Sequence, residues 1–83
     1  MNFELSTHAK DVIIEREIDL DWISVVITNP AFKEADKDDS SLWHLYARIP
    51  EHGNRLLRVV LNTTIVPPRV VTAYFDRTKG KTV

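Results

Sequence analysis

The sequence predicts an α+β fold in which two N-terminal helices pack on one face of a three- to four-stranded antiparallel sheet. Eighty-three residues are too few to divide between two hydrophobic cores, so residues 1–83 are expected to form a single domain. Apolar side chains recur at helical spacing only before Asn29-Pro30, and after this point they alternate as they do in strands. Glycine and proline fall between the alternating runs, which is typical of turns that join antiparallel strands.

Two short helices are expected before residue 30. Ser6 or Thr7 can cap the first helix, because a side-chain oxygen there accepts a hydrogen bond from the first turn. Its helically spaced residues are Ala9, Val12, Ile13 and Arg16. Asp19 can cap the second helix, and Asn29-Pro30 ends it. Its apolar stripe is Trp22, Ile23, Val26 and Ile27. Together the two helices are expected to form an αα-hairpin.

Three alternating runs predict the main strands. They extend from Leu42 to Ile49, from Arg55 to Asn62 and from Arg69 to Phe75. A turn containing Gly53 predicts a hairpin between the first two runs, and Pro67-Pro68 closes the next loop. Phe32 to Ala35 can add a short edge strand as a fourth. The basic tail from Asp76 to Val83 is expected to be frayed.

Alternation divides the strand residues between two faces of the sheet. The more apolar face should meet the helices, and it comprises Trp43, Leu45, Ala47, Ile49, Leu57, Val59, Leu61, Val71, Ala73 and Phe75. The opposite face should display His44, Tyr46, Arg48, Arg58, Thr72 and Tyr74, interspersed with Leu42, Leu56, Val60 and Val70. We call this mixed surface the second face, and it is the candidate functional surface.

Composition excludes several classes of site. The absence of cysteine rules out disulfides, thiolate metal sites and a cysteine nucleophile. The sequence has neither a glycine-rich phosphate loop nor a metalloprotease or hydrolase motif, so no cofactor is expected. The three histidines lack metal-ligand spacing, and the aspartates of residues 36–39 are expected to form a solvated loop. No apolar run is long enough for a membrane span and the N-terminus has no signal-peptide pattern, so a cytoplasmic protein is expected.

The net charge of −1 conceals an uneven distribution. Residues 1–41 carry a charge of −6 and residues 42–83 carry +5. Such asymmetry can mark an anion-binding face on the second half, for example one that binds nucleic acid. Alternatively, the two halves simply attract each other within the fold.

The second face could support RNA cleavage without a metal ion. That reaction needs a base for the 2′-hydroxyl, an acid for the leaving oxygen and cations for the phosphorane. Arg48 and Arg58 could clamp a phosphate, His44 or Tyr46 could exchange a proton, and Tyr74 could do so or stack on a base. The alternative is that cross-strand Tyr–Arg pairs merely stabilise an exposed sheet face.

His8 and Arg16 lie eight residues apart on the first helix, so they share roughly one side of it. A histidine at a helix start often only faces water, and an arginine in the last turn suits the helix dipole. A structural role for both is therefore the simpler interpretation.

Several segments resemble a bacterial family catalogued as domain of unknown function family 4258. The segments are Ser6-Thr7-His8-Ala9, Glu15-Arg16-Glu17-Ile18, Trp22-Ile23, Asn29-Pro30, Leu57-Arg58-Val59-Val60, Val71 to Arg77 and Lys79-Gly80-Lys81. They span nearly the whole chain in the right order. That family is similar to the small RelE/BrnT-type toxins of bacterial toxin–antitoxin pairs, whose helices are followed by an antiparallel sheet. The resemblance implies a metal-independent endoribonuclease that acts on mRNA, free or at the ribosome, and is held inactive by an antitoxin protein.

The resemblance also implies site residues. His8 and Arg16 match the helix motif, Arg58 matches the basic residue of the central strand, and Thr72, Tyr74 and Arg77 match the last strand and its exit. Combined with the second face, the expected catalytic residues are His8, His44, Arg58 and Tyr74. The expected RNA-binding residues are Arg16, Tyr46, Arg48, Thr72 and Arg77. The chain departs from such toxins in its sequence pI near 6.3, since they are usually strongly basic, and in lacking a lysine on the second face.

Two alternatives to the enzyme remain open. One is a non-enzymatic module whose sheet face or edge strand, Phe32 to Ala35, docks a partner protein. The other is an inactive toxin relative, in which the strand arginines should pair with acidic residues of the first half of the chain. An enzyme should instead bring its histidine, arginine and tyrosine side chains together around a concave spot.

Overall fold

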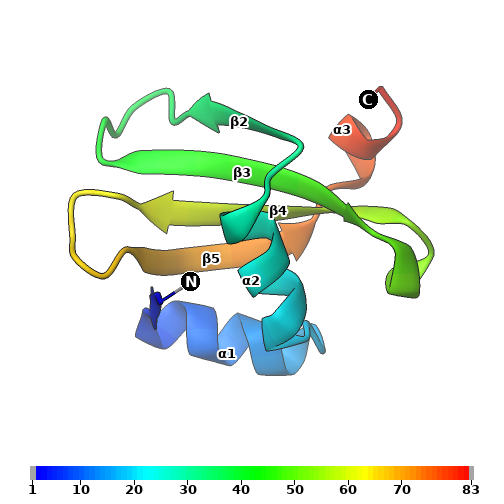
Figure 1. Ribbon diagram of the computed structural model, residues 1–83, viewed down its shortest axis with the longest axis horizontal. Helices are drawn as coiled ribbons and strands as arrows, with labels where there is room; N and C mark the ends of the chain where they lie inside the picture. Colours follow the sequence, from blue (N-terminus) through cyan, green and yellow to red (C-terminus); the bar gives the residue numbers. More distant parts are fainter. Residues whose placement is uncertain (1, 83) are drawn as a thin grey trace.

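The computed structural model describes residues 2–82 and contains a five-stranded mixed sheet with three α-helices (Figure 1). The strands lie in the order β1-β5-β4-β3-β2. Their bounds are β1 Glu4–Leu5, β2 Phe32–Ala35, β3 Leu42–Ile49, β4 Arg55–Asn62 and β5 Arg69–Phe75. The helices are α1 Thr7–Glu15, α2 Leu20–Thr28 and α3 Arg77–Gly80, and a 3-10 turn at Pro50–His52 joins β3 to β4. The predicted α+β class is confirmed.

The prediction of a three- to four-stranded antiparallel sheet is wrong in two respects. Strands β2 to β5 pair antiparallel as expected, and β2 is an edge strand. A fifth strand, β1, pairs parallel with β5 through Glu4↔Arg69 and Leu5↔Val70. Two residues are too few to show an alternating pattern, so β1 forms only because β5 offers an unpaired edge.

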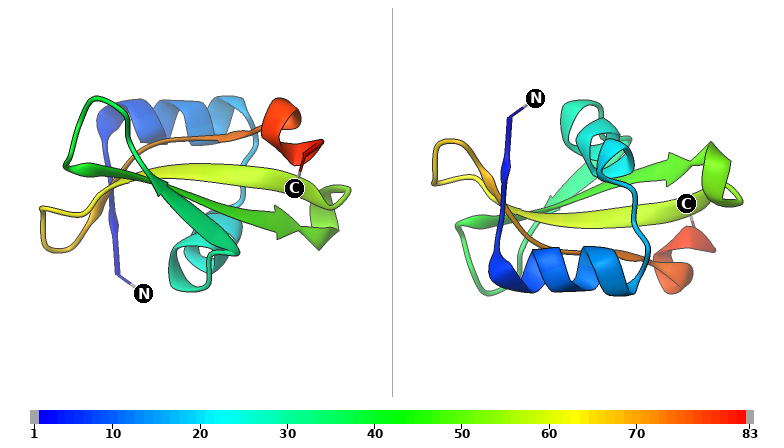
Figure 2. Two further views of the ribbon diagram at one scale, coloured as in Figure 1. Left: turned by 90° about the horizontal axis from the view of Figure 1, so that it is seen from above. Right: turned by 90° about the horizontal axis from the view of Figure 1, so that it is seen from below.

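Both helices begin where the sequence predicts. The Ser6 hydroxyl accepts a hydrogen bond from Ala9 N at 3.0 Å, and the Asp19 carboxylate accepts one from Asp21 N at 2.8 Å. The two helices do not pack against each other as the expected hairpin: the strands run between α1 and α2 in both views of Figure 2, although buried residues of both helices belong to one core with the sheet. Helix α2 lies across β3 and β4, whereas α1 lies along β5.

The hydrophobic core joins α1 and α2 to the more apolar face of the sheet. The fully or nearly buried strand residues of this core are Leu45, Ala47, Ile49, Leu57, Val59, Leu61, Val70 and Ala73. The sequence assigns Val71 to this face, but the structure places Val70 there, with no exposed surface. The pairs Val60↔Thr72 and Leu61↔Val70 leave Val71 as an extra residue, and this bulge reverses the alternation of β5 beyond it.

The tail is not frayed as predicted, because residues 77–80 form α3. Asp76 caps this helix: its Oδ1 accepts a hydrogen bond from Lys79 N at 2.8 Å, and its carbonyl accepts one from Gly80 N at 3.0 Å. A Cβ at Gly80 would lie 3.6 Å from the Cβ of the buried Leu56, so α3 packs closely on β4. The tail therefore helps to frame the second face.

None of the helices within residues 2–82 is both long enough and apolar enough to cross a membrane.

Candidate functional site

Arg58 is the centre of the second face. The strand register places it between Tyr46 on β3 and Tyr74 on β5. Its guanidinium donates hydrogen bonds to both phenolic oxygens, and its Nη2 lies 3.1 Å from Oδ2 of Asp76. The guanidinium carbon also lies 4.8 Å from the centre of the Tyr46 ring and 5.3 Å from that of Tyr74. Only 19% of the Arg58 side chain is exposed, so these partners hold its charge in one place.

The environment of Arg58 keeps it positively charged. Burial opposes the charged form, but the hydrogen bond to Tyr74 and the nearby Tyr46 oxygen outweigh this effect and raise the pKa of Arg58. Its Nε is buried and has no hydrogen-bond partner among the residues described. The site thus contains a fixed cation with one unsatisfied donor.

Tyr46 is fully buried and supports Arg58. Its ring stacks on Phe32 with the centroids 4.4 Å apart and the planes 12° from parallel. Burial, followed by the hydrogen bond to Glu34, raises the pKa of Tyr46 to about 12. The hydrogen bonds from Lys79 and then Tyr46 lower the pKa of Glu34, and Lys79 Nζ lies 2.7 Å from Glu34 Oε1. Near neutral pH, Tyr46 therefore stays protonated and supports Arg58. Its buried ring leaves little surface on which an RNA base could stack.

His44 lies on the same side of the sheet and is oriented by a carboxylate. Its Nε2 lies 2.6 Å from Oδ1 of Asp36. The hydrogen bond with His44, followed by those from the backbone N–H groups of Asp38 and Asp39, lowers the pKa of Asp36. The other ring nitrogen of His44, Nδ1, is buried and lacks a hydrogen-bond partner within residues 2–82. The loop expected to be merely solvated thus fixes the orientation of the imidazole.

A cavity of about 340 Å³ brings several of the predicted residues together. It lies between β2, the loop after it and the second face, and its lining includes His44, Tyr46 and Arg58. The other lining residues are Glu34, Ala35, Asp36, Lys37, Asp38 and Lys79. Tyr74 reaches this group through its hydrogen bond with Arg58. Histidine, arginine and tyrosine therefore meet around one concave spot, as the enzyme hypothesis requires.

His8 and Arg16 lie beside β5, to which Thr72 belongs, and none of the three lines this cavity. The Nε2 of the exposed His8 lies 3.3 Å from Oγ1 of Thr72. Arg16 donates a hydrogen bond to the carbonyl oxygen of Ala73 at 2.8 Å, and its guanidinium carbon lies 6.0 Å from the centre of the Tyr74 ring. Because β1 ends at Leu5, Ser6 and Arg16 at the two ends of α1 donate to the carbonyl oxygens of Val71 and Ala73, which the β5 edge would otherwise expose.

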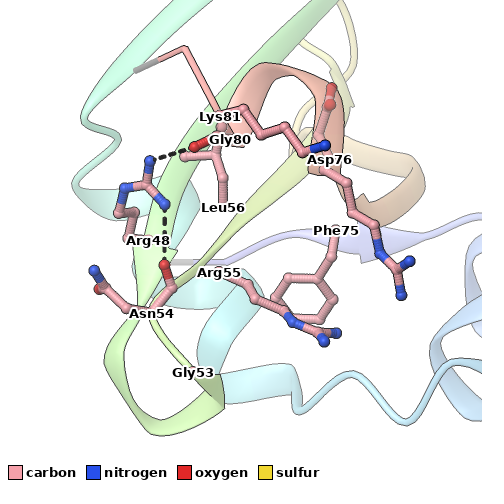
Figure 3. Close-up of a pocket in the computed structure, with 10 residues that line it drawn as sticks. Arg48, Gly53, Asn54, Arg55, Leu56, Phe75, Asp76, Gly80 and Lys81 are labelled. Atoms are coloured by element: carbon pink, nitrogen blue, oxygen red, sulfur yellow. Dashed lines mark hydrogen bonds between the residues drawn. The ribbon is translucent and has the colours of Figure 1, made fainter.

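Arg48 and Arg77 line a second cavity, at the far end of β3 and β4. Arg48 donates hydrogen bonds to the carbonyl oxygens of Asn54, at 3.0 Å, and Gly80, at 2.8 Å (Figure 3). It thereby ties the β3–β4 hairpin to the end of α3. Arg77 is exposed. Neither residue lines the cavity around Arg58 and His44.

Sequence reasoning missed three residues of the Arg58 environment: Asp76, Lys79 and Glu34. Asp76 and Lys79 were assigned to a frayed tail. An available signal was an aspartate followed by a glycine four residues later, since aspartate favours the start of a helix and glycine its end. Glu34 lies on the edge strand, and no local pattern in the sequence indicates its bond to Lys79.

The ion pairs show how the oppositely charged halves meet. Glu4 pairs with Arg69 at 3.4 Å and Glu34 with Lys79 at 2.7 Å, so both pairs join the first half to the second. Arg58 pairs with Asp76 of its own half, whereas the inactive-relative hypothesis expects an acid from the first half. Within the part of the chain described, no three His, Asp or Glu side chains are grouped so that they could hold a metal ion.

Comparisons with known proteins identify a family. No curated protein and no solved structure matches the chain. The sequence profile of the family described as Domain of unknown function (DUF4258) matches residues 5–75, which include β3, β4, β5 and both N-terminal helices. The chain therefore belongs to the DUF4258 family, as its resemblance predicted.

Proposed function

We propose that this protein is a toxin-like RNA endonuclease that works without a metal ion and is held inactive by an antitoxin-type protein. The observation that carries the proposal is the position of Arg58, held between the hydroxyls of Tyr46 and Tyr74 beside a cavity that also contains His44. The likeness of this family to RelE/BrnT-type toxins stays a prediction, and the antitoxin part of the proposal rests on that likeness.

The proposed reaction uses the 2′-hydroxyl of RNA as the nucleophile. A base removes the 2′-hydroxyl proton as its oxygen attacks the adjacent phosphorus. The bond from phosphorus to the 5′-oxygen breaks as an acid protonates that oxygen, so the products are a 2′,3′-cyclic phosphate and a 5′-hydroxyl. Arg58 stabilises the extra negative charge of the phosphorane, because a fixed cation in a partly buried site interacts strongly with developing charge. A guanidinium has five N–H donors; Tyr46, Tyr74 and Asp76 take three of them and the Nε donor is buried, so the second Nη1 hydrogen is the donor left for a phosphate oxygen.

Proton transfer falls to Tyr74 and His44. Tyr46 is buried and its pKa is about 12, so its role is to position Arg58. Tyr74 places its hydroxyl against the guanidinium, where charge changes during the reaction. His44 has Nε2 held by Asp36, and its other nitrogen, Nδ1, is buried, so His44 exchanges a proton only when RNA in the cavity reaches that atom. His8, beside Thr72, is the third candidate for proton transfer.

The test is cleavage of mixed single-stranded RNA by the purified protein in EDTA and, separately, of mRNA on translating ribosomes in the magnesium buffer that ribosomes need. We expect cleavage by the wild type, its loss in Arg58→Lys, and a rate about 100-fold lower in Tyr74→Phe because a general acid–base group is removed. Arg58→Lys keeps the charge that Asp76 needs but removes the planar guanidinium. Arg69→Ala is the matched control, since it removes a strand arginine outside both cavities. No cleavage in either setting would contradict the proposal.

One observation favours a second candidate, a protein-docking module. Among the strands of residues 2–82, β2 is an edge of the sheet and pairs with β3 alone, so its other side is open to a further strand. If the protein cleaves no RNA but binds an antitoxin-type protein, substitution of Lys33 by proline should abolish that binding, because proline cannot donate to an added strand.

A further inference from the structure

The second cavity, lined by Arg48 and Arg77, has the composition of an anion site. It occupies about 310 Å³ between the β3–β4 hairpin, the end of β5 and α3. Its positively charged lining residues are Arg48, Arg55, Arg77 and Lys81. The single carboxylate among them, Asp76, is already paired with Arg58 and capping α3. Four cations thus surround one cavity in a protein whose net charge is −1.

Three of these cations are available to a ligand. Arg55, Arg77 and Lys81 are exposed, and none of them forms an ion pair within residues 2–82. Like charges placed together repel, so such a cluster costs stability unless an anion occupies it. Ten of the twelve acidic residues of the chain lie before residue 42, and none of these ten lines the cavity.

The walls of the cavity are held in shape. Arg48 joins Asn54 on the hairpin to Gly80 at the end of α3, and Figure 3 shows these bonds closing one side of the cavity. The ring of Phe75 contributes an apolar wall and stacks on His52 with the centroids 4.6 Å apart. A preformed concave site with guanidinium groups suits phosphate oxygens, which an arginine binds in pairs.

The two cavities have no lining residue in common within residues 2–82, but paired and consecutive residues join them. Asp76, which lines the second cavity, pairs with Arg58, which lines the first. In α3, Lys79 lines the first cavity and the next residue, Gly80, lines the second. A nucleic-acid strand, which carries a phosphate at every nucleotide, can therefore contact Arg58 and continue past α3 into the second cavity. A single free anion would use only one of them.

We infer that the cavity lined by Arg55, Arg77 and Lys81 is a subsite for a backbone phosphate of single-stranded RNA that flanks the nucleotide at Arg58. This inference rests on the proposed function, because it places the RNA relative to the reacting phosphate. It is a binding subsite, and its residues take no part in proton transfer.

The test measures binding apart from cleavage. The probe is a fluorescein-labelled single-stranded RNA octamer with 2′-O-methyl groups, which cannot be cleaved by its own 2′-oxygen. Arg55→Ala/Arg77→Ala is compared with Lys10→Ala/Arg69→Ala, which removes the same charge outside both cavities. We expect the first variant to bind at least about tenfold more weakly. The slope of its log affinity against log salt should fall by about 0.7, the value for one phosphate contact on a single strand.

Each outcome separates the subsite from the proposed reaction. If the wild type binds the octamer, the first variant binds weakly and neither cleaves natural RNA, then the subsite stands and the endonuclease proposal fails. If the wild type cleaves RNA but both variants bind the octamer alike, the subsite is overturned and the endonuclease stands. Failure of the wild type to bind the octamer also overturns the subsite. Adenosine monophosphate that binds as tightly as the octamer would assign the cavity to free nucleotides and overturn the RNA assignment.

Discussion

The carboxylate of Asp76 serves two parts of the molecule: its Oδ2 lies 3.1 Å from Nη2 of Arg58, and its Oδ1 accepts a hydrogen bond from Lys79 N. The same side chain therefore neutralises the central cation of the second face and starts α3. Through α3 it also places Lys79 beside Glu34 and Gly80 beside Arg48. The candidate site and the tail of the chain are consequently one structural unit.

Removal of the Asp76 carboxylate should destabilise the protein through both roles. Asp76→Ala loses the helix cap and leaves the Arg58 charge without its carboxylate, so we expect a loss of about 2 kcal/mol or more. Asp76→Asn keeps a capping side chain and should lose about 1 kcal/mol less. Urea unfolding at pH 7 measures both variants. Equal losses would show that the cap contributes nothing.

Tyr46 should make the protein less stable at alkaline pH. Its pKa is raised to about 12 in the folded state from an ordinary value of 10.0. The unfolded chain then releases its proton first, so stability is fully present below pH 10 and falls as the pH rises toward 12. A shift of this size corresponds to about 1–3 kcal/mol. Unfolding measured from pH 8 to 11.5 should show this loss in the wild type and a smaller one in Tyr46→Phe. Identical profiles would contradict the assignment.

Asp36 should contribute stability that disappears in acid. The hydrogen bond with His44, and those from the backbone of the following loop, hold the pKa of Asp36 below its ordinary value of 3.8. The stabilisation is therefore present above that value and is lost as the pH falls through the lowered pKa. Asp36→Asn should show less loss of stability than the wild type between pH 4 and 2. The exposed Asp11→Asn is the control and should follow the wild type.

Arg16 should matter for stability because it satisfies the carbonyl oxygen of Ala73 at the edge of the sheet. Arg16→Ala should cost about 0.5–1.5 kcal/mol, the usual contribution of one hydrogen bond. Thermal unfolding beside Lys10→Ala, an exposed cation of the same helix, checks this value. A decrease in RNA affinity with no change in stability would instead assign Arg16 to RNA binding.

The sequence was sufficient to locate the three long strands, because alternation and turn residues mark both ends of each. Alternation also placed Tyr46, Arg58 and Tyr74 on one face, and the register confirms that they are neighbours. Strand β1 could not be predicted, since a two-residue parallel pair depends on an edge that lies 65 residues further along the chain. The bulge at Val71 was equally hidden, because alternation assumes that no residue is inserted.

The partners of Arg58 were only partly predictable. The contacts of Arg58 with the two tyrosines can be predicted from strand alternation, because alternation is a local pattern in the sequence. The ion pair with Asp76 depends on how the chain turns after β5, and the bond between Lys79 and Glu34 depends on α3 reaching the opposite edge strand. Such contacts between segments of different structure have no period in the sequence. The cavity beside His44 arises from these contacts, and so its shape emerges only in the folded chain.

The most direct test of the proposed reaction is the chemistry of the RNA ends that the protein produces in EDTA. A short RNA with a single ribonucleotide in an otherwise 2′-deoxy strand offers one 2′-hydroxyl as nucleophile. We predict cleavage at that position alone, with a 2′,3′-cyclic phosphate on one fragment and a 5′-hydroxyl on the other. Mass spectrometry identifies both ends. Fragments with a 5′-phosphate, or cleavage that stops in EDTA, would contradict the account of Arg58 and Tyr74 as the groups that replace a metal ion.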